Sequence, residues 1–189
     1  MSYYDAHELA QLGFAAIGKD VKISRLASIY GASRIAIGDH SRIDDFCVLS
    51  AGTDGILIGR HVHVAVMCAI MGAAEIRLDD YSGLSSRVSV YSSTDDYSGS
   101  AMTNPTVPAE YLNVMSQPVL IGRHVIVGAG SVILPGAILH EGAALGSLSL
   151  ARGELEGFAI HAGTPARRIA ERKRNFLAMA ASFERDAET

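Results

Sequence analysis

The chain has 189 residues and a net charge of −4, which fits one domain and disfavours general binding to nucleic acid. Hydrophobic residues make up 49% of the chain but aromatic ones only 6%, so the core must be built from aliphatic side chains. No apolar run approaches the length of a membrane span, and the N-terminus lacks a signal-peptide pattern. We therefore expect a cytoplasmic protein without membrane insertion.

Residues 1–14 are predicted to form a short N-terminal helical segment. Ser2 and Asp5 have the spacing of N-capping residues, and Gly13 can end the helix. Leu9 and Leu12 would then pack this segment against the element that follows it.

Aliphatic residues recur at every sixth position through most of the chain. The runs begin at Ile17, Ile37, Ile58, Leu78 and Ile121, and a small residue usually follows each aliphatic one after four positions. An α-helix would need a period of 3.6 residues and a flat strand a period of two, whereas a period of six is typical of a parallel β-helix. The run starts predict 20 or 21 residues per coil, and a β-helix over residues 15–164.

Two columns of residues are expected to stack along the coils. The first has charges of alternating sign, and strands about 5 Å apart would bring opposite charges together. It consists of Lys19, Asp39, Arg60, Asp80, Arg123 and Glu141. The second is a hint of a functional face, although solvated surface histidines are the alternative. It consists of His40, His61, Tyr81 and His124.

The period of six stops over residues 94–118. A segment of this length without its own repeat is usually functional or disordered, and its Tyr, Pro and Asn content favours an ordered, functional loop. The buried positions predicted for Cys47 and Cys68 favour core packing over a disulfide. Beyond the coils, Pro165 is expected to open a C-terminal helix over residues 165–189, because proline suits the first turn.

The repeat, the interrupting loop and the closing sequence Ala162-Gly163-Thr164-Pro165-Ala166 together resemble one family. They are similar to the left-handed β-helix, hexapeptide-repeat acyltransferases, and most similar to sugar O- and N-acetyltransferases of surface-polysaccharide pathways. The galactoside and maltose acetyltransferases are relatives of this group. The resemblance implies an all-β, single-stranded left-handed parallel β-helix that works as a homotrimer. It also implies acetyl-CoA as co-substrate, no metal, and a sugar or nucleotide-sugar acceptor in O-antigen or lipopolysaccharide biosynthesis.

The resemblance places acetyl-CoA in the groove between two neighbouring chains. The pantetheine arm would pass small residues of the late coils, where the ligand can approach the backbone. The phosphates would meet the basic start of the final segment. The cofactor-binding residues implied in this way are Gly128, Ala129, Gly146, Ser147, Arg152, Thr164, Arg167 and Arg168.

Acyl transfer to a hydroxyl needs a base that takes the proton of the attacking oxygen. Members of the family that acetylate hydroxyls carry a histidine where the long loop leaves the coils, but the loop of this chain contains none. Asp95 or Asp96 could be the base if burial raises its pKa, and His63 or His124 could serve from a coil face.

Alternatively the acceptor is an amine, which needs mainly positioning and for which an aspartate would suffice. An aspartate pair at a loop mouth can also simply form a turn. Within the loop, the candidate substrate contacts are Tyr97, Asn104 and Tyr111.

Two other functions are compatible with a β-helix. One is a non-catalytic scaffold. The other is a zinc-dependent enzyme similar to carbonic anhydrase, in which three histidines converge on the metal. The closing sequence at Ala162–Ala166 favours a CoA-dependent enzyme over both. The histidines that could form such a zinc site are His40, His61, His63 and His124.

Overall fold

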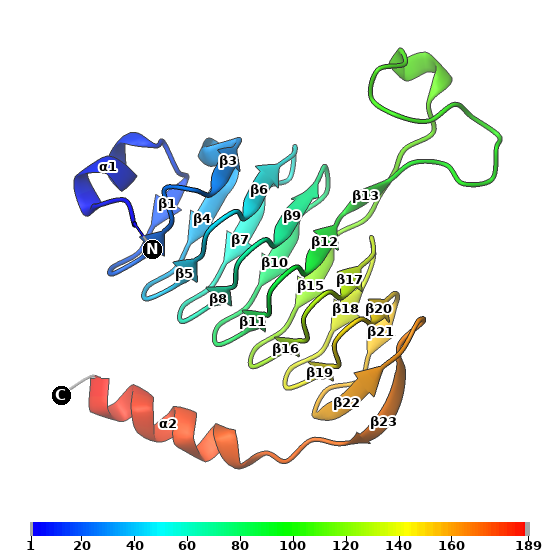
Figure 1. The fold of residues 1–189 in the computed structure, drawn as a ribbon. Helices are drawn as coiled ribbons and strands as arrows, with labels where there is room; N and C mark the ends of the chain where they lie inside the picture. The colour runs from blue at the N-terminus through cyan, green and yellow to red at the C-terminus, as the bar shows by residue number, and fades with distance from the viewer. Residues whose placement is uncertain (1, 188–189) are drawn as a thin grey trace.

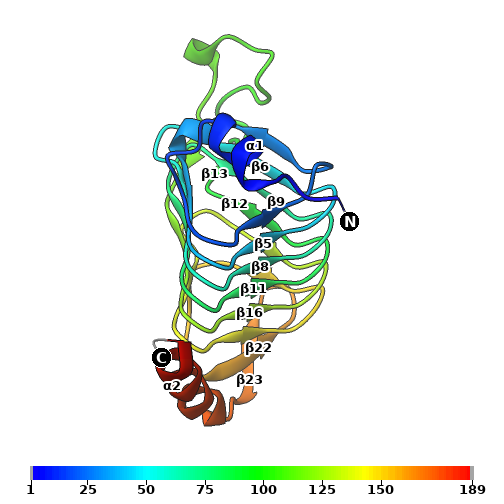
Figure 2. The same ribbon diagram turned by 90° about the vertical axis from the view of Figure 1, so that its left-hand side faces the viewer.

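Figure 1 shows the computed structural model, which describes residues 2–187, as a stack of coils with a helix near each terminus and a projecting arm. Each coil except the last contributes a short strand to each of three sheets, and the last coil contributes to the first two. Figure 2 shows the stack turned by 90°. We name the turn between the first and second sheets the first corner, and that between the second and third sheets the second corner. The third corner leads from the third sheet into the next coil.

The strands of each sheet are parallel, apart from β23 at the end of the second. The first sheet contains β1 (Ala16–Ile17), β4 (Ile35–Ile37), β7 (Ile56–Ile58), β10 (Ile76–Leu78), β15 (Val119–Ile121), β18 (Ile138–Leu139) and β21 (Glu154–Leu155). The second contains β2 (Lys22–Ile23), β5 (Arg42–Ile43), β8 (His63–Val64), β11 (Gly83–Leu84), β16 (Ile126–Val127), β19 (Ala144–Leu145), β22 (Ala159–Ala162) and β23 (Arg167–Glu171). The third contains β3 (Ser28–Tyr30), β6 (Val48–Ala51), β9 (Ala69–Gly72), β12 (Ser89–Tyr91), β17 (Val132–Ile133) and β20 (Leu150–Ala151).

The register of the strands is the one that the period of six predicts. Ile37 pairs with Ile58, and Ile58 pairs with Leu78. Leu78 then pairs with Ile121, so the long loop interrupts the chain without shifting the stack. The prediction of a parallel β-helix is confirmed.

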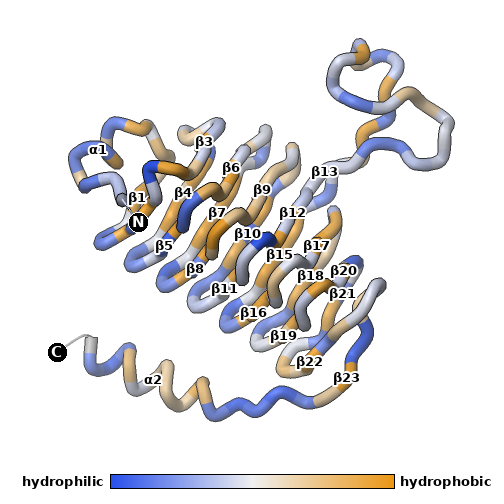
Figure 3. Tube along the Cα trace, viewed as in Figure 1, coloured by the Kyte–Doolittle hydropathy of each residue, from blue (hydrophilic) through white to orange (hydrophobic). Residues whose placement is uncertain are grey.

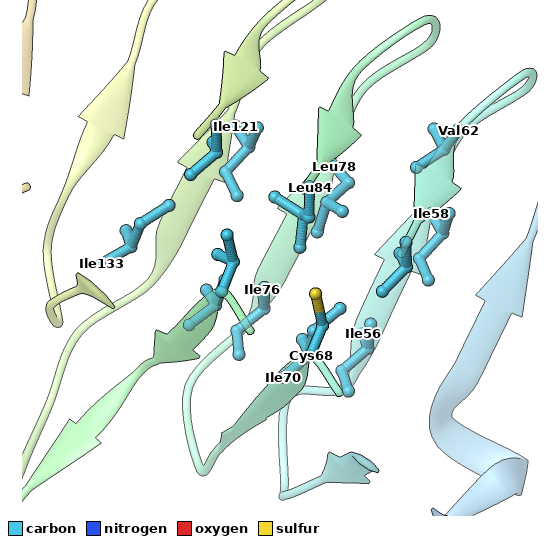
Figure 4. Packing of buried hydrophobic residues seen from close by; sticks show 14 of the residues in the cluster. Ile56, Ile58, Val62, Cys68, Ile70, Ile76, Leu78, Leu84, Ile121 and Ile133 are labelled. Atoms are coloured by element: carbon cyan, nitrogen blue, oxygen red, sulfur yellow. The ribbon is translucent and has the colours of Figure 1, made fainter. Parts of the chain in front are cut away.

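Aliphatic side chains fill the interior of the coils. Figure 4 shows isoleucine, leucine and valine side chains of successive coils stacked inside the stack, with Cys68 among them. Cys47 and Cys68 are both buried and free, and each Sγ lies about 3 Å from a backbone carbonyl of the next coil, as expected for core residues. Figure 3 shows hydrophobic residues recurring along the coils, and hydrophilic residues in the segment that leads into α2 (Asn175–Ala187).

The column of alternating charges is present along the first corner. Asp39 Oδ1 accepts a hydrogen bond from the backbone N of Lys19 at 2.7 Å. Asp80 accepts one from the backbone N of Arg60 at 2.7 Å and another from its guanidinium Nη2 at 3.0 Å. These carboxylates therefore join consecutive coils through backbone amides as well as through charge.

The N-terminal helix α1 (Ala6–Gln11) is shorter than predicted, and Asp5 alone is its N-cap. Asp5 Oδ1 accepts a hydrogen bond from Glu8 N at 2.9 Å, and Glu8 Oε2 accepts one from Asp5 N at 2.8 Å. This reciprocal pair is a capping box, so the expectation that Ser2 shares the cap was wrong. Leu9 is buried against the first coil, as predicted.

The C-terminal helix begins at Asn175, so the prediction that Pro165 opens it was wrong. Pro165 follows a cis peptide bond and lies in the turn between β22 and β23. β23 runs antiparallel to β22 and pairs Arg167 with Ala162. Because the last coil would otherwise expose an unpaired strand edge, pairing takes precedence there over helix formation.

The loop predicted at 94–118 is a projecting arm with secondary structure of its own. β13 (Ser93–Thr94) and β14 (Met115–Ser116) pair antiparallel as its stem, and Ala109–Tyr111 forms a 3-10 helix near its tip. Another 3-10 helix, Ala32–Arg34, lies at the third corner of an early coil. Figures 1 and 2 show the arm extending away from the coils at the third corner.

The column of His40, His61, Tyr81 and His124 is where α2 docks. Successive rings stack with centroids 4.9 to 5.1 Å apart, although each residue has a positive φ. From α2, Phe183 packs edge-on against His61. On the same helix, Glu184 Oε1 accepts hydrogen bonds from the Tyr81 hydroxyl at 2.9 Å and from an Arg123 Nη2 at 2.6 Å.

The contribution of this column to stability depends on protonation of its histidines. Burial lowers the pKa of both His61 and His124. The unfolded chain, with an imidazole pKa of about 6.5, therefore binds these protons before the folded chain does. Their contribution is complete above that pH and falls as the pH drops toward the lowered values.

We predict that α2 loosens in mild acid. Hydrogen exchange of the α2 amides, corrected for intrinsic rates, should accelerate between about pH 7.5 and about pH 5.5, because protonated rings resist burial. Replacing His61 and His124 by Tyr, the residue already at position 81 of the column, should remove this acceleration. Equal acceleration in the double variant would show that the histidines are not its cause.

Candidate active site

A pocket of about 490 Å³ lies where the arm leaves the coils. Its polar groups come from the stem of the arm, and its apolar floor comes from the coil that follows the arm. Asp95 and Tyr97 both line it, so the structure brings these two candidate residues together. The full lining is Tyr91, Ser93, Thr94, Asp95, Tyr97, Val114, Val132, Leu134 and Pro135.

The two adjacent aspartates have different surroundings. Asp96 accepts hydrogen bonds from Ser98 N at 2.8 Å and Ser98 Oγ at 3.0 Å, and from the backbone N of Ser100 and of Ala101, each at 3.1 Å. These bonds, led by the one from the Ser98 hydroxyl, lower the pKa of Asp96. Its carboxylate therefore holds a turn, which is the alternative that the sequence left open.

Asp95 differs from Asp96 in that it lines the pocket. Its Oδ2 accepts a hydrogen bond of 3.3 Å from the backbone N of Asn104, and the carboxylate lines the pocket. Asn104 thus supports Asp95 through its backbone, while its side-chain Oδ1 accepts a bond from Thr106 N at 3.1 Å. Tyr111 is exposed in the 3-10 helix of the arm and is not among the residues that line this pocket.

His63 belongs to the second sheet, which faces away from the third corner. Its Nε2 lies 2.8 Å from Asp44 Oδ2, and Arg42 Nε lies 2.6 Å from Asp44 Oδ1. The Asp44 side chain is 4% exposed and that of His63 is 51% exposed. Within one chain, Asp95 and His63 therefore lie on opposite sides of the β-helix.

His124 lies under α2, away from the pocket at the arm. It is 8% exposed, stacks on Tyr81 and contacts Phe176 with ring centroids 5.1 Å apart. Its backbone carbonyl accepts a hydrogen bond from Arg172 Nη1 at 2.7 Å, which ties the segment before α2 to the coils. His40 stacks on His61, and the ring of Tyr81 lies between His61 and His124, so these three histidines of one chain do not converge as zinc ligands would.

The small residues expected along the pantetheine arm lie together at the second corner. Gly128 N bonds to the carbonyl of Leu145, and Leu148 N bonds to that of Ala129, so Ala129 and Ser147 follow in the same register. A Cβ at Gly128 would come within 2.4 Å of Ser147 N. Close contact between coils therefore requires glycine at position 128, whether or not a ligand passes there.

The basic residues expected near the phosphates lie around the last coil. Arg168 forms ion pairs with Glu156 and Glu171, whereas Arg167 Nη1 donates to the carbonyl of Ala166 at 3.0 Å. Thr164 Oγ1 lies 3.5 Å from the carbonyl oxygen of Leu148, which is a weak contact. Arg152 is exposed where the last strand of the third sheet ends.

Comparison with known proteins decides the family. No protein-family model matches the chain. The chain is 48% identical over 187 residues to dTDP-4-amino-4,6-dideoxy-D-glucose acyltransferase of Escherichia coli, covering 99% of this chain and 97% of that protein. The chain belongs to this acyltransferase family. The left-handed β-helix and the acyltransferase that the resemblance implied are thereby confirmed, and an enzyme is favoured over the non-catalytic scaffold.

Solved structures agree with this assignment. AntD, an N-acyltransferase from Bacillus cereus in complex with dTDP and 3-hydroxybutyryl-CoA, superposes with a TM-score of 0.94 at 39% identity, covering 100% of this chain and 99% of that one. A variant of AntD in which one serine is replaced by alanine was solved in complex with dTDP-4-amino-4,6-dideoxyglucose and coenzyme A. It superposes on this chain with the same TM-score of 0.94, at 40% identity over 98% of each chain. A shorter match joins 68 residues, 36% of this chain and 35% of that protein, at 34% identity to the putative lipopolysaccharide biosynthesis O-acetyl transferase WbbJ of E. coli K12.

We predict that the two aspartates differ in function. Asp95→Asn should lower kcat by about 100-fold or more, because it removes a proton acceptor from the pocket, and should leave the Kd of acyl-CoA within about twofold. Asp96→Asn should lower kcat by less than about tenfold, because it alters only a turn. Steady-state kinetics and calorimetry on both variants measure this. A larger loss of kcat in Asp96→Asn than in Asp95→Asn would contradict the assignment of the catalytic carboxylate to Asp95.

Proposed function

We propose that the protein transfers an acyl group from acyl-CoA to the 4-amino group of dTDP-4-amino-4,6-dideoxyglucose or a close analogue. The observation that carries this proposal is the carboxylate of Asp95 in the arm pocket, in a loop that has no histidine. The relative from E. coli is named for this acceptor, and a structure of AntD contains it together with coenzyme A.

An amine acceptor suits an aspartate better than a hydroxyl does. At neutral pH a sugar amine is largely an ammonium ion, which a carboxylate can bind by charge and relieve of one proton. The neutral amine is then a good nucleophile, so the enzyme has mainly to hold it against the thioester. Deprotonating a hydroxyl takes a much stronger base than a free aspartate, whose pKa in model peptides is about 3.9. N-acylation is therefore proposed over O-acylation.

The substitutions in AntD are consistent with a role for this aspartate. Its solved variants replace one aspartate by Asn or Ala and one serine by Ala, Thr or Cys. Two serine–aspartate pairs of this chain have the same separation in sequence as those two residues of AntD. They are Ser85 with Asp95 and Ser86 with Asp96. Since Asp96 is committed to its turn, the first pair is the better counterpart.

Acyl-CoA is proposed to lie along the second corner. The small residues Gly128, Ala129, Gly146 and Ser147 would flank the pantetheine arm there. In the coil next toward the N-terminus, the equivalent position to Gly128 is Ser85, whose backbone N bonds to the carbonyl of Val127. The phosphates would meet Thr164 and the basic residues Arg152, Arg167 and Arg168.

We propose that the active enzyme is a homotrimer and that the arm of one subunit reaches its neighbour. The arm exposes several large apolar side chains, which favours their burial against another copy of the chain. The second corner also presents exposed Phe46, Met67 and Leu148. A closed ring of three subunits would bring the arm pocket of one chain to the second sheet of the next. The exposed apolar residues of the arm are Tyr97, Met102, Tyr111, Val114 and Met115.

The proposed setting is the synthesis of a surface polysaccharide in the cytoplasm. The partial match to a lipopolysaccharide O-acetyl transferase supports the first part. Nucleotide sugars and CoA carry several charges and cross lipid poorly, which supports the second. None of the helices within residues 2–187 is long and apolar enough to span a membrane.

A panel of acceptors tests the proposed function. Release of free thiol from acetyl-CoA and from 3-hydroxybutyryl-CoA should be measured with dTDP-4-amino-4,6-dideoxyglucose, with its 4-hydroxyl counterpart, and with galactosides and maltose. We expect turnover with the amino sugar and a rate at least about 100-fold lower with the 4-hydroxyl compound, since the hydroxyl is the weaker nucleophile. Preferred turnover of the hydroxyl sugars would contradict N-acylation.

A further inference from the structure

The hydrogen bonds around Asp44 determine which nitrogen of His63 carries a proton. Burial by itself raises the pKa of Asp44, but the hydrogen bonds from Arg42 and His63 outweigh burial and hold that pKa below its usual value. Asp44 is therefore an ionised carboxylate, which can only accept hydrogen bonds. His63 Nε2, 2.8 Å from Asp44 Oδ2, must then donate its proton, and Nδ1 of the neutral ring is left as a proton acceptor.

His63 borders a hollow on the second sheet. It lines a hollow of about 320 Å³ together with Gly83, Ser85, Ser86 and Ile126. A Cβ at Gly83 would meet no atom nearer than the carbonyl oxygen of His63 at 3.8 Å, and Gly83 is not among the glycines with a positive φ.

Other glycines of the β-helix differ from Gly83 in this respect. A Cβ at Gly59 would meet Asp80 Oδ1 at 2.5 Å, and one at Gly128 would meet Ser147 N at 2.4 Å. These positions need glycine because consecutive coils approach closely, whereas the strand of Gly83 has room for a side chain. The absence of a side chain at Gly83, next to His63, thus favours the interpretation that this hollow accommodates a ligand.

This hollow continues the proposed path of acyl-CoA. Ser85 and Gly128 occupy equivalent places in neighbouring coils, because the backbone N of Ser85 bonds to the carbonyl of Val127. A pantetheine arm that passes Gly146 and then Gly128 would therefore bring its thioester toward Ser85 and Gly83. That is the position at which His63 faces the hollow.

We propose that His63 is a second catalytic residue of the acyl transfer and that Asp44 is its positioning residue. The inference rests on the proposed function and adds a group that handles the proton between nitrogen and sulfur. The arm of the neighbouring subunit would supply Asp95, and the second sheet of this subunit would supply His63. One complete site would thus contain both residues from two chains.

The two groups would share the protons of the reaction. Asp95 takes one proton from the sugar ammonium, and the free amine attacks the thioester carbonyl to form the C–N bond. His63 Nδ1 then takes the second proton from that nitrogen. As the C–S bond breaks, the same imidazole passes this proton to the leaving sulfur, so that the products are the amide and CoA thiol. The proton on Asp95 goes to solvent.

Nitrogen chemical shifts of His63 test the contact without any acceptor. In protein labelled with ¹⁵N-histidine, the His63 signals, assigned by their loss in His63→Gln, should show a protonated Nε2 and an unprotonated Nδ1. Acetyl-CoA should shift them, and Asp44→Asn should mix the two tautomers. Acetyl-CoA that binds by calorimetry but leaves the His63 signals unmoved would overturn the proposal.

Kinetics test the catalytic role. His63→Gln should lower kcat about 100-fold with the Kd of acetyl-CoA changed less than about twofold. Asp44→Asn should lower kcat about tenfold and shift the acidic limb of its pH profile, which a purely structural role would not do. The matched control is His140→Gln, because His140 also pairs with a carboxylate, Glu154, at 3.0 Å but lies at the first corner and does not line the hollow beside His63. It should retain full kcat.

The outcomes separate this inference from the proposed function. Unchanged kcat in His63→Gln overturns the role of His63 even if the amino sugar is the acceptor. Shifts of the His63 signals with acetyl-CoA, in a protein that turns over only hydroxyl sugars, would support the contact while contradicting the proposed acceptor.

Discussion

The hydrogen bonds between consecutive coils are the constraint on which the rest of the structure depends. Each coil pairs with the next at the same position, so a residue has its counterparts one coil above and one below. Inward positions must hold aliphatic or small side chains, because the interior of a narrow coil has no room for large rings. Outward positions form columns, and each column can acquire one role along its whole length.

The columns divide the surface of this protein between structure and chemistry. At the first corner, stacked rings and alternating charges hold α2 against the coils. At the second corner, small residues leave a path beside the second sheet, where Gly83 and His63 meet open space. At the third corner, the arm carries Asp95 away from the body of its own chain. Chemistry that needs both Asp95 and His63 therefore requires a second copy.

The sequence predicts the coils well because their period is imposed by backbone geometry. The interruption after Val90 did not obscure the register, since Ile121 resumes it. The position of Asp95 at the arm followed from the same count. Strand pairing could not be predicted after Pro165, because proline is compatible with both a helix start and a turn, and the edge of the last coil decides between them.

Contacts between side chains of different coils were the hardest to predict. The role of Asp44 was missed, because it reaches diagonally to His63 across 19 positions of sequence, and a period identifies only residues that stack directly. Its signal in the sequence was weak: an aspartate one position after Ile43, where the equivalent positions of later coils hold Ala65 and Ser85. The sequence predicts the stacked rings, but only the structure shows that α2 covers them.

The central claim is that one active site combines Asp95 of one subunit with His63 of its neighbour. Mixing subunits of Asp95→Asn and His63→Gln under conditions of exchange, and measuring thiol release, tests it most directly. In random trimers about one quarter of the sites would join an intact arm to an intact second sheet, so activity should rise to about one quarter of that of the unaltered enzyme. Mixed trimers that stay as inactive as the two parents would contradict the account.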